Sequence, residues 1–268
     1  MTIARIVLVV SAVNAAAVTM LARLWMLANP NPLHRWIWIA GMLALDAVSL
    51  WGVFERRAPV FGPIVSRTRP RIPAVAITFD DGPTEPYTSQ ILDVLRMYDA
   101  RATFFVLGAR ATAVPEVLRR AAAEGHEIAN HGWDHEALPL HGPAYIRETI
   151  GRTSTLVAQI TGRRPTLFRA PFGWRNPWVN RSAWVEGCRP VAWSIGVHDT
   201  DHPDAETIAS RAIAGLQSGT ILLLHDGRSL DPSPDASHVV DALPRILRAA
   251  RDRGFQLLTL SALLANSE

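Results

Sequence analysis

Between residues 74 and 260, strand-like runs alternate with longer helix-like runs. The strand-like runs are Val75–Phe79, Thr103–Leu107, Glu127–Ala129, Thr166–Arg169, Pro190–Ile195, Thr220–Leu224 and Phe255–Leu260. The helix-like runs are Thr88–Tyr98, Pro115–Glu124, Ala144–Ile160, Ala205–Leu216 and Val239–Arg253. This alternation is typical of parallel strands joined by crossover helices, and seven such strands fit a (β/α) barrel. We therefore predict an α/β fold for the larger part of the chain.

Two aspartates end the first strand-like run, within the sequence Thr-Phe-Asp-Asp-Gly-Pro that closes at Pro83. Glycine and proline end the strand, and side chains alternate along it, so we expect Asp80 and Asp81 to point in different directions. One carboxylate can then bind a metal ion while the other faces the reacting group. The alternative is a plain turn, because Asp, Gly and Pro all favour turns.

A second polar cluster, His-Gly-Trp-Asp-His, runs from His131 to His135. A separation of four residues places both histidines on one face of a helical turn. Two imidazoles and one carboxylate suit Zn²⁺ and leave a coordination position open for water. The alternative is a pair of ordinary polar residues on a loop. Together with the aspartates, the pair indicates metal-assisted hydrolysis of a substrate.

These motifs resemble those of the NodB-homology polysaccharide deacetylases, metal-dependent enzymes that remove acyl groups from amino sugars. The resemblance covers about residues 72 to 260 and rests above all on the Thr-Phe-Asp-Asp-Gly-Pro motif. It implies an irregular (β/α) barrel in which Asp80 is the catalytic base and Asp81, His131 and His135 hold a divalent metal ion. Zn²⁺ fits these ligands best, and Co²⁺, Ni²⁺ or Mn²⁺ would also suit them.

Later motifs extend the resemblance. The sequence Arg-Ala-Pro-Phe-Gly, which begins at Arg169, resembles the third family motif, in which the arginine positions and polarises the base. Asp199 falls where the family has the aspartate that tethers this arginine. Leu-Leu-Leu-His, which ends at His225, resembles the last motif, and would supply His225 as general acid and Leu223 as a wall of the acyl pocket.

The acyl pocket departs from the family pattern, because Thr200 stands where the family has tryptophan. We therefore expect either that another aromatic residue, Trp174, Trp178 or Trp193, walls the pocket, or that the pocket is shaped for a different acyl group. The residues expected to contact the substrate are Pro171, Phe172, Gly173, Trp174 and Leu223.

Two further polar features each have two possible interpretations. Gly132 stands where the family usually has serine or threonine, so support for the second histidine is missing or comes from Asp134. The run from His198 to His202 could form a second metal cluster, but charged loop clusters are usually solvated. We therefore expect a polar loop there.

Composition excludes several rival chemistries. The chain has no lysine, so Schiff-base catalysis and a P-loop lysine are excluded. Its single cysteine, Cys188, excludes an internal disulfide and a cysteine-rich zinc module. No Gly-x-Ser-x-Gly elbow is present. The net charge of +3 is modest and the arginines of the presumed domain are dispersed, so we expect no nucleic-acid partner.

The N-terminal quarter consists of two apolar runs, residues 6–22 and 36–54, separated by Asn-Pro-Asn-Pro at residues 29–32. Each run is near the ~20 residues needed to cross a bilayer. We therefore predict that residues 1–54 form a membrane-anchoring helical hairpin, with a secretory signal or an interfacial hairpin as the alternatives. Asp46 would be costly facing lipid, so it must face the other helix, a partner or water.

An arginine- and proline-rich linker is predicted at residues 55–73, before the deacetylase domain at residues 74–268. Arginines beside a membrane segment favour the cytoplasmic side, and the loop around Arg35, which has few arginines, would then lie outside. The family is more often extracytoplasmic, so that location is the alternative. We expect the catalytic domain on the cytoplasmic face of the membrane.

The predicted function is metal-dependent removal of an N-acyl group, acetyl or formyl, from an amino sugar, with a lipid-linked amino sugar as one candidate substrate. Two alternatives stay open. One is hydrolysis of another amide, such as a cyclic imide or ureide, and the other is a pseudoenzyme that only binds a glycan or lipid. The pairing of Asp80 with His225 counts against the pseudoenzyme, because a binding module needs neither residue.

Overall fold

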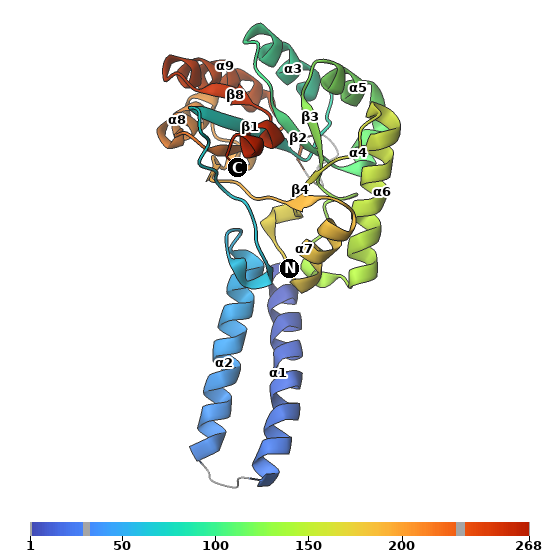
Figure 1. The fold of residues 1–268 in the computed structure, drawn as a ribbon, viewed down its shortest axis with the longest axis vertical. Coiled ribbons are helices and arrows are strands. Elements are labelled where there is room, and N and C mark those ends of the chain that lie inside the picture. The colour runs from blue at the N-terminus through green and yellow to red at the C-terminus, as the bar shows by residue number, and fades with distance from the viewer. Residues whose placement is uncertain (1, 29–32, 229–233, 268) are drawn as a thin grey trace.

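The computed structural model describes residues 2–28, 33–228 and 234–267 of the chain. It consists of an α/β domain from which two long helices project as a hairpin (Figure 1). The hairpin helices are α1 (Thr2–Ala28) and α2 (Leu33–Phe54). The predicted break at residues 29–32 lies outside the described residues, and so does the side chain of Arg35.

A parallel sheet forms the centre of the domain, and its strand order is β5-β4-β3-β2-β1-β7-β6, with β8 pairing with β1. Its strands are β1 (Ala74–Asp80), β2 (Thr103–Val106), β3 (Glu127–Asn130), β4 (Leu167–Phe168), β5 (Arg189–Pro190), β6 (Ile195–Gly196), β7 (Ile221–His225) and β8 (Gln256–Leu258). Every strand pair is parallel, as the alternation of strands and helices predicts.

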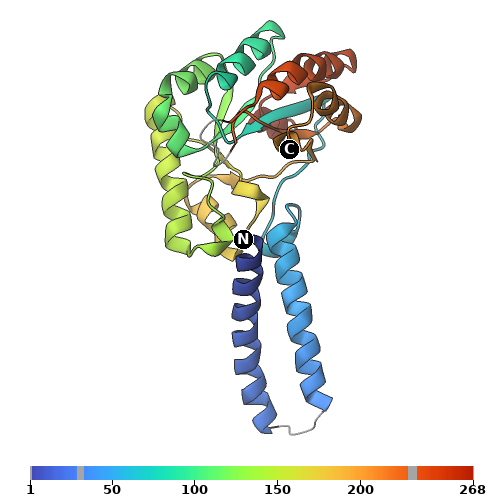
Figure 2. The ribbon, with the colours of Figure 1, turned by 180° about the vertical axis from the view of Figure 1, so that it is seen from behind.

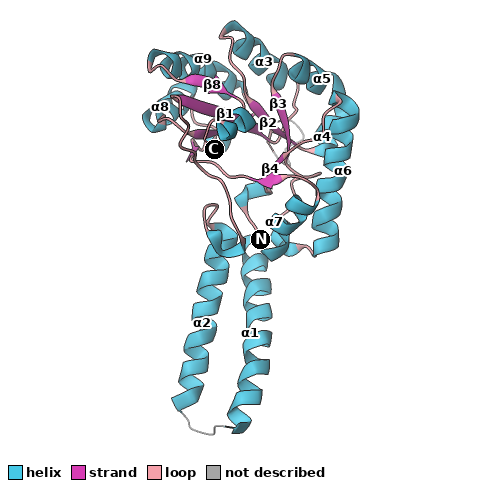
Figure 3. Cartoon of the chain, in the orientation of Figure 1, coloured by secondary structure: helices cyan, strands magenta, loops and turns pink. Residues whose placement is uncertain are grey.

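Helices cover the outer face of the curled sheet (Figures 2 and 3). They are α3 (Tyr87–Met97), α4 (Gly108–Ala113), α5 (Pro115–Ala123), α6 (Pro143–Thr161), α7 (Pro177–Val185), α8 (Ala205–Gly215) and α9 (Ser237–Asp252). A last short helix, α10 (Leu260–Ala265), packs against β1 from the interior. Short 3₁₀ turns complete the connections at Pro59–Phe61, Leu138–Leu140, Pro171–Gly173 and Asp199–Asp201.

One predicted strand is divided into two segments that pair with opposite edges of the sheet. β5 pairs with β4, and β6, a few residues later, pairs with β7. Between the two segments, the Ala192 amide donates to the Val65 carbonyl, and the Ser194 amide donates to the Ile221 carbonyl. The run expected at Pro190–Ile195 therefore spans the gap between the two edges and curls the sheet toward a barrel.

The alternation of side chains along β1 separates two cores. Ile77 and Phe79 pack outward against residues of α3 and α9. Ala74 and Ala76 pack inward with buried leucines of α10. Continuing the same alternation toward the carboxyl end of the strand places Asp80 on the inward side. The barrel interior is thus apolar at one end and receives a carboxylate at the other.

The hairpin has the composition of a membrane anchor. Two segments, Ile3–Arg23 and Trp36–Phe54, are long and apolar enough to span a bilayer, and little of either is buried in the protein. The Asn14 side-chain amide donates to Asp46 at 2.8 Å and to Ser49 at 3.1 Å. Asp46 therefore faces the other helix, as predicted, and this contact gives its carboxylate a polar partner away from lipid.

The hairpin packs against the domain at its base. Ile6 and Val53 are each 1% exposed and form a small apolar cluster with Ala137 of the domain. Residues 55–73, predicted as a linker, also make backbone hydrogen bonds with the domain. The Thr68 amide donates to the Gly219 carbonyl, and the Arg71 amide donates to the carbonyl of Asn266. The division at residues 54 and 73 stays a prediction, but the segment between them is packed.

Candidate active site

Asp80 lies at the inward-facing end of β1 and is held by a buried arginine. Arg169 follows β4, is fully buried, and donates from Nη1 to Asp80 Oδ1 at 2.6 Å and to Thr78 Oγ1 at 2.9 Å. Its guanidinium carbon lies 4.0 Å from the centroid of the Phe105 ring. Burial lowers the pKa of Arg169 and the Asp80 carboxylate raises it. The predicted contact between Arg169 and Asp80 is thus present.

Asp81 enters the same pocket as Asp80 because its backbone is in the left-handed region. Strict alternation would send Asp81 to the outer face, but its φ of 76° turns the side chain back. Its Oδ1 lies 3.2 Å from His131 Nε2 and 3.1 Å from His135 Nε2. The expectation of different directions therefore needs a correction, since both carboxylates line one pocket, although they face different partners.

The two histidines come from a loop rather than from the helical turn that their spacing predicts. His131 directly follows β3, and His135 reaches the site through backbone with positive φ at Gly132 (85°) and at His135 itself (59°). The spacing of four residues was therefore a poor guide to their backbone, although the predicted proximity is correct. At a φ of 85°, a serine or threonine in place of Gly132 would be strained.

Asp81, His131 and His135 form the candidate metal group, with ligand atoms that all lie within 4.8 Å of one another. The His131 Nδ1 donates to the Arg169 carbonyl at 2.8 Å, which leaves the lone pair of Nε2 directed at the centre of the group. Burial raises the pKa of Asp81, but its close contacts with His131 and His135 and the charges of His135 and His225 hold it well below its usual range. An ionised carboxylate and a neutral imidazole tautomer of this kind fit a divalent cation.

Support for the second histidine does not come from Asp134. That side chain is exposed, and its carboxylate accepts a long hydrogen bond of 3.4 Å from the Tyr145 hydroxyl. The loop is held instead by Asn130, whose side-chain oxygen accepts from the Gly132 amide at 2.8 Å. The buried Nδ1 of His135 has no hydrogen-bond partner among the described residues.

The Asp199 carboxylate holds His225, not Arg169, which corrects the predicted tether. His225 Nδ1 donates to Asp199 Oδ1 at 3.0 Å, and the backbone amide of His225 donates to Oδ2 at 2.7 Å. Arg169 is anchored instead by Thr78 and by the Ala192 carbonyl, 3.2 Å from Nη2. The aspartate thus serves the opposite side of the pocket from the one expected.

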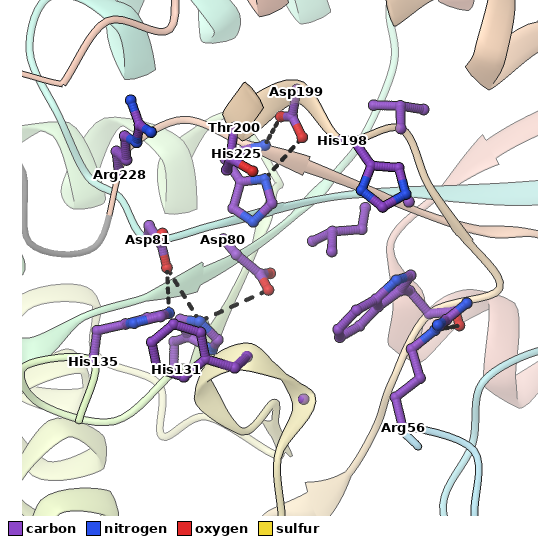
Figure 4. A pocket seen from close by; sticks show the side chains of 16 residues that line it. Arg56, Asp80, Asp81, His131, His135, His198, Asp199, Thr200, His225 and Arg228 are labelled. Carbon is purple, nitrogen blue, oxygen red and sulfur yellow. Dashed lines mark hydrogen bonds and ion pairs between the residues drawn. The ribbon is translucent and has the colours of Figure 1, made fainter. Parts of the chain in front are cut away.

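The environment of His225 favours its protonated form. Burial lowers the pKa of His225, but the charge and hydrogen bond of Asp199, with the charges of Asp81 and Asp80, raise it to about 10. With Nδ1 bound to Asp199, Nε2 is left to face the pocket (Figure 4). His225 can therefore present a proton to a group bound beside the metal ligands.

A cavity of about 350 Å³ joins these groups. The predicted contacts Phe172, Gly173 and Leu223 line this cavity, as does Trp193 among the three candidate tryptophans. Pro171, Trp174 and Trp178 are not among its lining residues. Pro171 is buried in the turn before Phe172, and the Trp174 ring stacks on Phe172 and meets Phe54 of α2 edge to edge. Trp178 lies on α7 and is 44% exposed.

The polar run from His198 to His202 is divided between the cavity and the surface. His198, Asp199 and Thr200 line the cavity, whereas Asp201 and His202 do not. The run does not form a metal cluster, because the only group of potential ligands found among the described residues is the one at Asp81.

Two arginines in the cavity, Arg56 and Arg228, follow no recognisable sequence pattern. They come from the segment after α2 and from the loop after β7, and only the folded chain brings them together. The contact of Thr78 with Arg169 could have been predicted, because alternation places Thr78 on the same inward side of β1 as Asp80.

The profile of the Polysaccharide deacetylase family matches residues 67–191. A peptidoglycan-N-acetylglucosamine deacetylase of Bacillus cereus is 36% identical over 192 residues, which make up 71% of this chain and 87% of that protein. The chain belongs to the polysaccharide deacetylase family. A chitooligosaccharide deacetylase of Sinorhizobium fredii is also 36% identical to this polysaccharide deacetylase, over 72% of this chain and 95% of that protein.

A solved structure confirms the fold of this polysaccharide deacetylase. The peptidoglycan deacetylase PdaC from Bacillus subtilis matches with a TM-score of 0.65 and 34% identity, over 74% of this chain and 93% of that chain. The predicted family and barrel fold are therefore confirmed. Because the relatives are named carbohydrate deacetylases, the protein is a carbohydrate N-deacetylase, as predicted.

Proposed function

We propose that the protein is a metal-dependent hydrolase that removes an N-acetyl group from an amino sugar at a membrane surface. One observation carries this proposal. A carboxylate held by an arginine and an imidazole held by a carboxylate face one cavity, on two sides of a buried Asp/His/His group (Figure 4). Amide hydrolysis needs a base, an acid and stabilisation of an oxyanion, and this cavity can provide all three.

Asp81, His131 and His135 would hold the divalent ion, and Zn²⁺ is the best match to one carboxylate and two imidazoles. When bound, such an ion lowers the pKa of water and polarises a carbonyl oxygen. The His131 tautomer is set by the Arg169 carbonyl, so the chain orients this ligand through its own backbone.

Asp80 is the proposed general base. Its Oδ2 lies 3.8 Å from His131 Nε2, so the carboxylate stands beside the metal ligands without being one of them. The ion pair from Arg169 to Oδ1 fixes the orientation of the carboxyl group and leaves Oδ2 to take a proton from the attacking water.

His225 is the proposed general acid. The amine that leaves an amide needs a proton, and the imidazolium can donate one from Nε2 while Asp199 holds Nδ1. Because Asp199 also accepts from the His225 backbone amide, the ring and the end of β7 are fixed as one unit. The acyl group would lie against the apolar walls formed by Leu223 and Trp193.

Membrane anchoring is supported by the position of exposed apolar side chains in the domain. Trp178, Trp184 and Val185 of α7 are 44%, 50% and 55% exposed, and Trp184 and Val185 border the same groove as Phe61, in the segment that follows α2. Tryptophan is enriched where a protein meets the headgroup region. We infer that this face of the domain lies against the bilayer, which brings the cavity within reach of a lipid-linked amino sugar.

The side of the membrane can be settled with single-cysteine reporters. The only native cysteine, Cys188, is buried, so a cysteine introduced at exposed Gln90 would be the one reactive thiol. We propose the cytoplasmic side, on the arginine content of residues 56–71. Labelling of intact cells by a membrane-impermeant maleimide would overturn this and place the domain outside, where peptidoglycan-type substrates lie.

The deacetylase proposal is tested with the purified full chain, reconstituted in phospholipid vesicles with Zn²⁺. Acetate release is measured from N-acetylated chitooligosaccharide, and formate release from its N-formylated analogue. We expect acetate release that is abolished in Asp80→Asn. Hydrolysis of a cyclic imide or ureide in place of both sugars would refute the proposal, and release of neither product from any of these compounds would favour a binding protein.

A further inference from the structure

A guanidinium from the segment next to the membrane helices enters the catalytic cavity. Arg56 follows Phe54, the last residue of α2, yet its side chain lines the cavity together with Asp80 and His225 (Figure 4). Its Nε donates to the Trp193 carbonyl at 3.3 Å, and its guanidinium carbon lies 5.1 Å from the centroid of the Trp193 ring. The cavity is therefore built partly from a segment that precedes the whole barrel.

The backbone that carries Arg56 is held in place by a second arginine. Arg175 is 1% exposed, and its Nη2 donates to the carbonyls of Ala58 at 2.7 Å and of Glu55 and Arg56 at 3.4 Å. Arg57 donates to the carbonyl of Ser194 at 2.5 Å. Arg56 is thus positioned before any substrate binds, which reduces the entropy lost when it binds an anion.

The carboxylates of the cavity are already paired with other groups. The pairs are Asp80 with Arg169, Asp199 with His225, and Asp81 with His131 and His135. None of the ion pairs between described residues includes Arg56, and its two Nη groups have no hydrogen-bond partner among those residues. Burial and the neighbouring Arg57 lower the pKa of Arg56 and Glu55 raises it, but an arginine stays protonated at neutral pH.

The cavity therefore carries unpaired positive charge on the side that adjoins the hairpin. Arg228 adds a second cation on the opposite side of the metal ligands, where it contacts His202 (Figure 4). A neutral glycan could accept hydrogen bonds from this guanidinium but would not pair with its charge. An anionic substrate would, because a guanidinium fork can donate two parallel hydrogen bonds to phosphate oxygens.

We propose that Arg56 binds a phosphate group that the substrate carries next to the amino sugar. This rests on the deacetylase function proposed above and adds the charge class of its substrate. Arg56 lies at the end of a candidate membrane span, which is the level at which phosphates of membrane lipids lie. A sugar joined to lipid through phosphate would present its phosphate to Arg56 and its N-acyl group to Asp80 and His225.

The test compares three forms of one N-acetylated chitotetraose, which are the neutral sugar, its reducing-end phosphate and its polyprenyl diphosphate. Each is assayed with the full chain in phospholipid vesicles, for the native protein and for Arg56→Ala, Arg56→Lys and Arg69→Ala. Arg69→Ala is the matched control, because it removes the same charge from an exposed residue of the same segment that does not line the cavity. Thermal unfolding of each variant reports whether it folds.

For the native protein we expect kcat/KM to be at least about tenfold higher on both phosphate-bearing forms than on the neutral sugar, as charge-assisted hydrogen bonds allow. Arg56→Ala should remove this preference by raising KM, Arg56→Lys should keep part of it, and Arg69→Ala should keep all of it. Equal loss on both phosphate forms identifies the phosphate itself as the recognised group. A loss confined to the polyprenyl form would overturn the proposal in favour of a lipid contact.

Binding is measured separately from turnover in an Asp80→Asn background, by titration calorimetry with the phosphate-bearing tetraose. A dissociation constant that Arg56→Ala leaves unchanged would refute the proposal, as would an equal loss of kcat/KM on neutral and phosphate forms, which is what a structural role predicts. If no tetraose is deacetylated while the phosphate form still binds through Arg56, the deacetylase function fails and the subsite stands.

Discussion

The two ends of β1 are both buried, but one end packs against apolar side chains and the other carries a charged side chain. At the amino end, Ala74 and Ala76 pack against leucines of α10 in an apolar core. At the carboxyl end, Asp80 is 3% exposed and meets Arg169, which is fully buried. Burial of apolar surface stabilises the fold by roughly 25 cal/mol per Å², whereas a buried charge is tolerated only with a partner. One strand thus links a region that stabilises the barrel to a region that performs its chemistry.

Backbone conformation follows the same division. Among the described residues, positive φ angles at residues other than glycine occur at Asp81, His135, Phe172 and His198, all of which line the cavity, and also at Asp99 and His202. Each such residue costs about 1–3 kcal/mol, and these conformations aim side chains that a regular strand would send elsewhere. At the carboxyl end of the sheet, strained backbone therefore lowers stability but directs side chains into the cavity. The amino end has no such strain among the residues named above. Substitutions at the two ends should separate activity from stability.

The largest expected effect is loss of the metal ion. The His131→Ala/His135→Ala double variant removes two of three candidate ligands, so the ion content should fall from about one per chain to near zero, and activity should fall to background. Elemental analysis of the purified protein gives the ion content. Full occupancy in the double variant would rule out this site. A gain in thermal stability of the metal-free variant would sharpen the comparison, because a buried polar cluster would have been removed.

Asp80→Asn should lower kcat by about a hundredfold to ten thousandfold, because general-base catalysis contributes about this much. The metal ligands remain, so ion content should be unchanged, and elemental analysis alongside steady-state kinetics checks both. The isosteric amide keeps the volume of the side chain but removes the charge that pairs with buried Arg169, so thermal stability should fall as well. Near-native kcat would mean that Asp80 is not the base.

Asp199→Asn should change the pH dependence of kcat/KM and lower its maximum by about tenfold to a hundredfold. The acid must be protonated, so activity falls as pH rises through the pKa of His225, which the nearby carboxylates raise to about 10. A cation at Asp81 offsets part of that increase, so the alkaline limb of the native enzyme should lie between 6.5 and about 10. Losing the Asp199 charge should move the limb toward lower pH. If the alkaline limb of the pH profile did not move, the limb would reflect the titration of a group other than His225.

The smallest expected effect on activity comes from the amino end of the barrel. Leu263 of α10 is fully buried among the inward-facing residues of the sheet. Leu263→Ala should cost about 2–5 kcal/mol of stability by leaving a cavity, while kcat measured below the unfolding transition should change less than about twofold. A large loss of kcat in a folded variant would break the comparison, since it would show that packing at one end of the barrel controls the other.

Local signals in the sequence were enough to predict much of this arrangement. The alternation of strands and helices predicts the parallel sheet, and the aspartates at the end of β1 predict where the chemistry lies. The alternation along β1 also predicts that Asp80 faces inward. The roles of Arg169 and His225 came from the resemblance to a family, because an isolated arginine or histidine has no distinctive pattern.

What the sequence could not predict depends on contacts between distant segments. The predicted partner of Asp199 is wrong because the pairing of β6 with β7, which brings His225 to Asp199, is not encoded in any local pattern. The loop of His131 and His135 was mistaken for a helical turn because positive φ at Gly132 leaves no trace in the spacing. The reach of Arg56 into the cavity depends on the packing of residues 55–58 against Arg175, which no local pattern encodes.

The strand order has a consequence for the growing chain. β1 to β5 are laid down in succession on one side of β1, and β7 later enters between β1 and β6. Asp80, Asp81, His131, His135 and Arg169 are therefore all synthesised before the chain reaches β5, whereas Asp199 and His225 follow it. During biosynthesis the candidate metal ligands and the proposed base can gather first. The proposed acid joins them only when β7 is inserted, so on the proposed roles an incomplete chain lacks the residue that protonates the leaving amine.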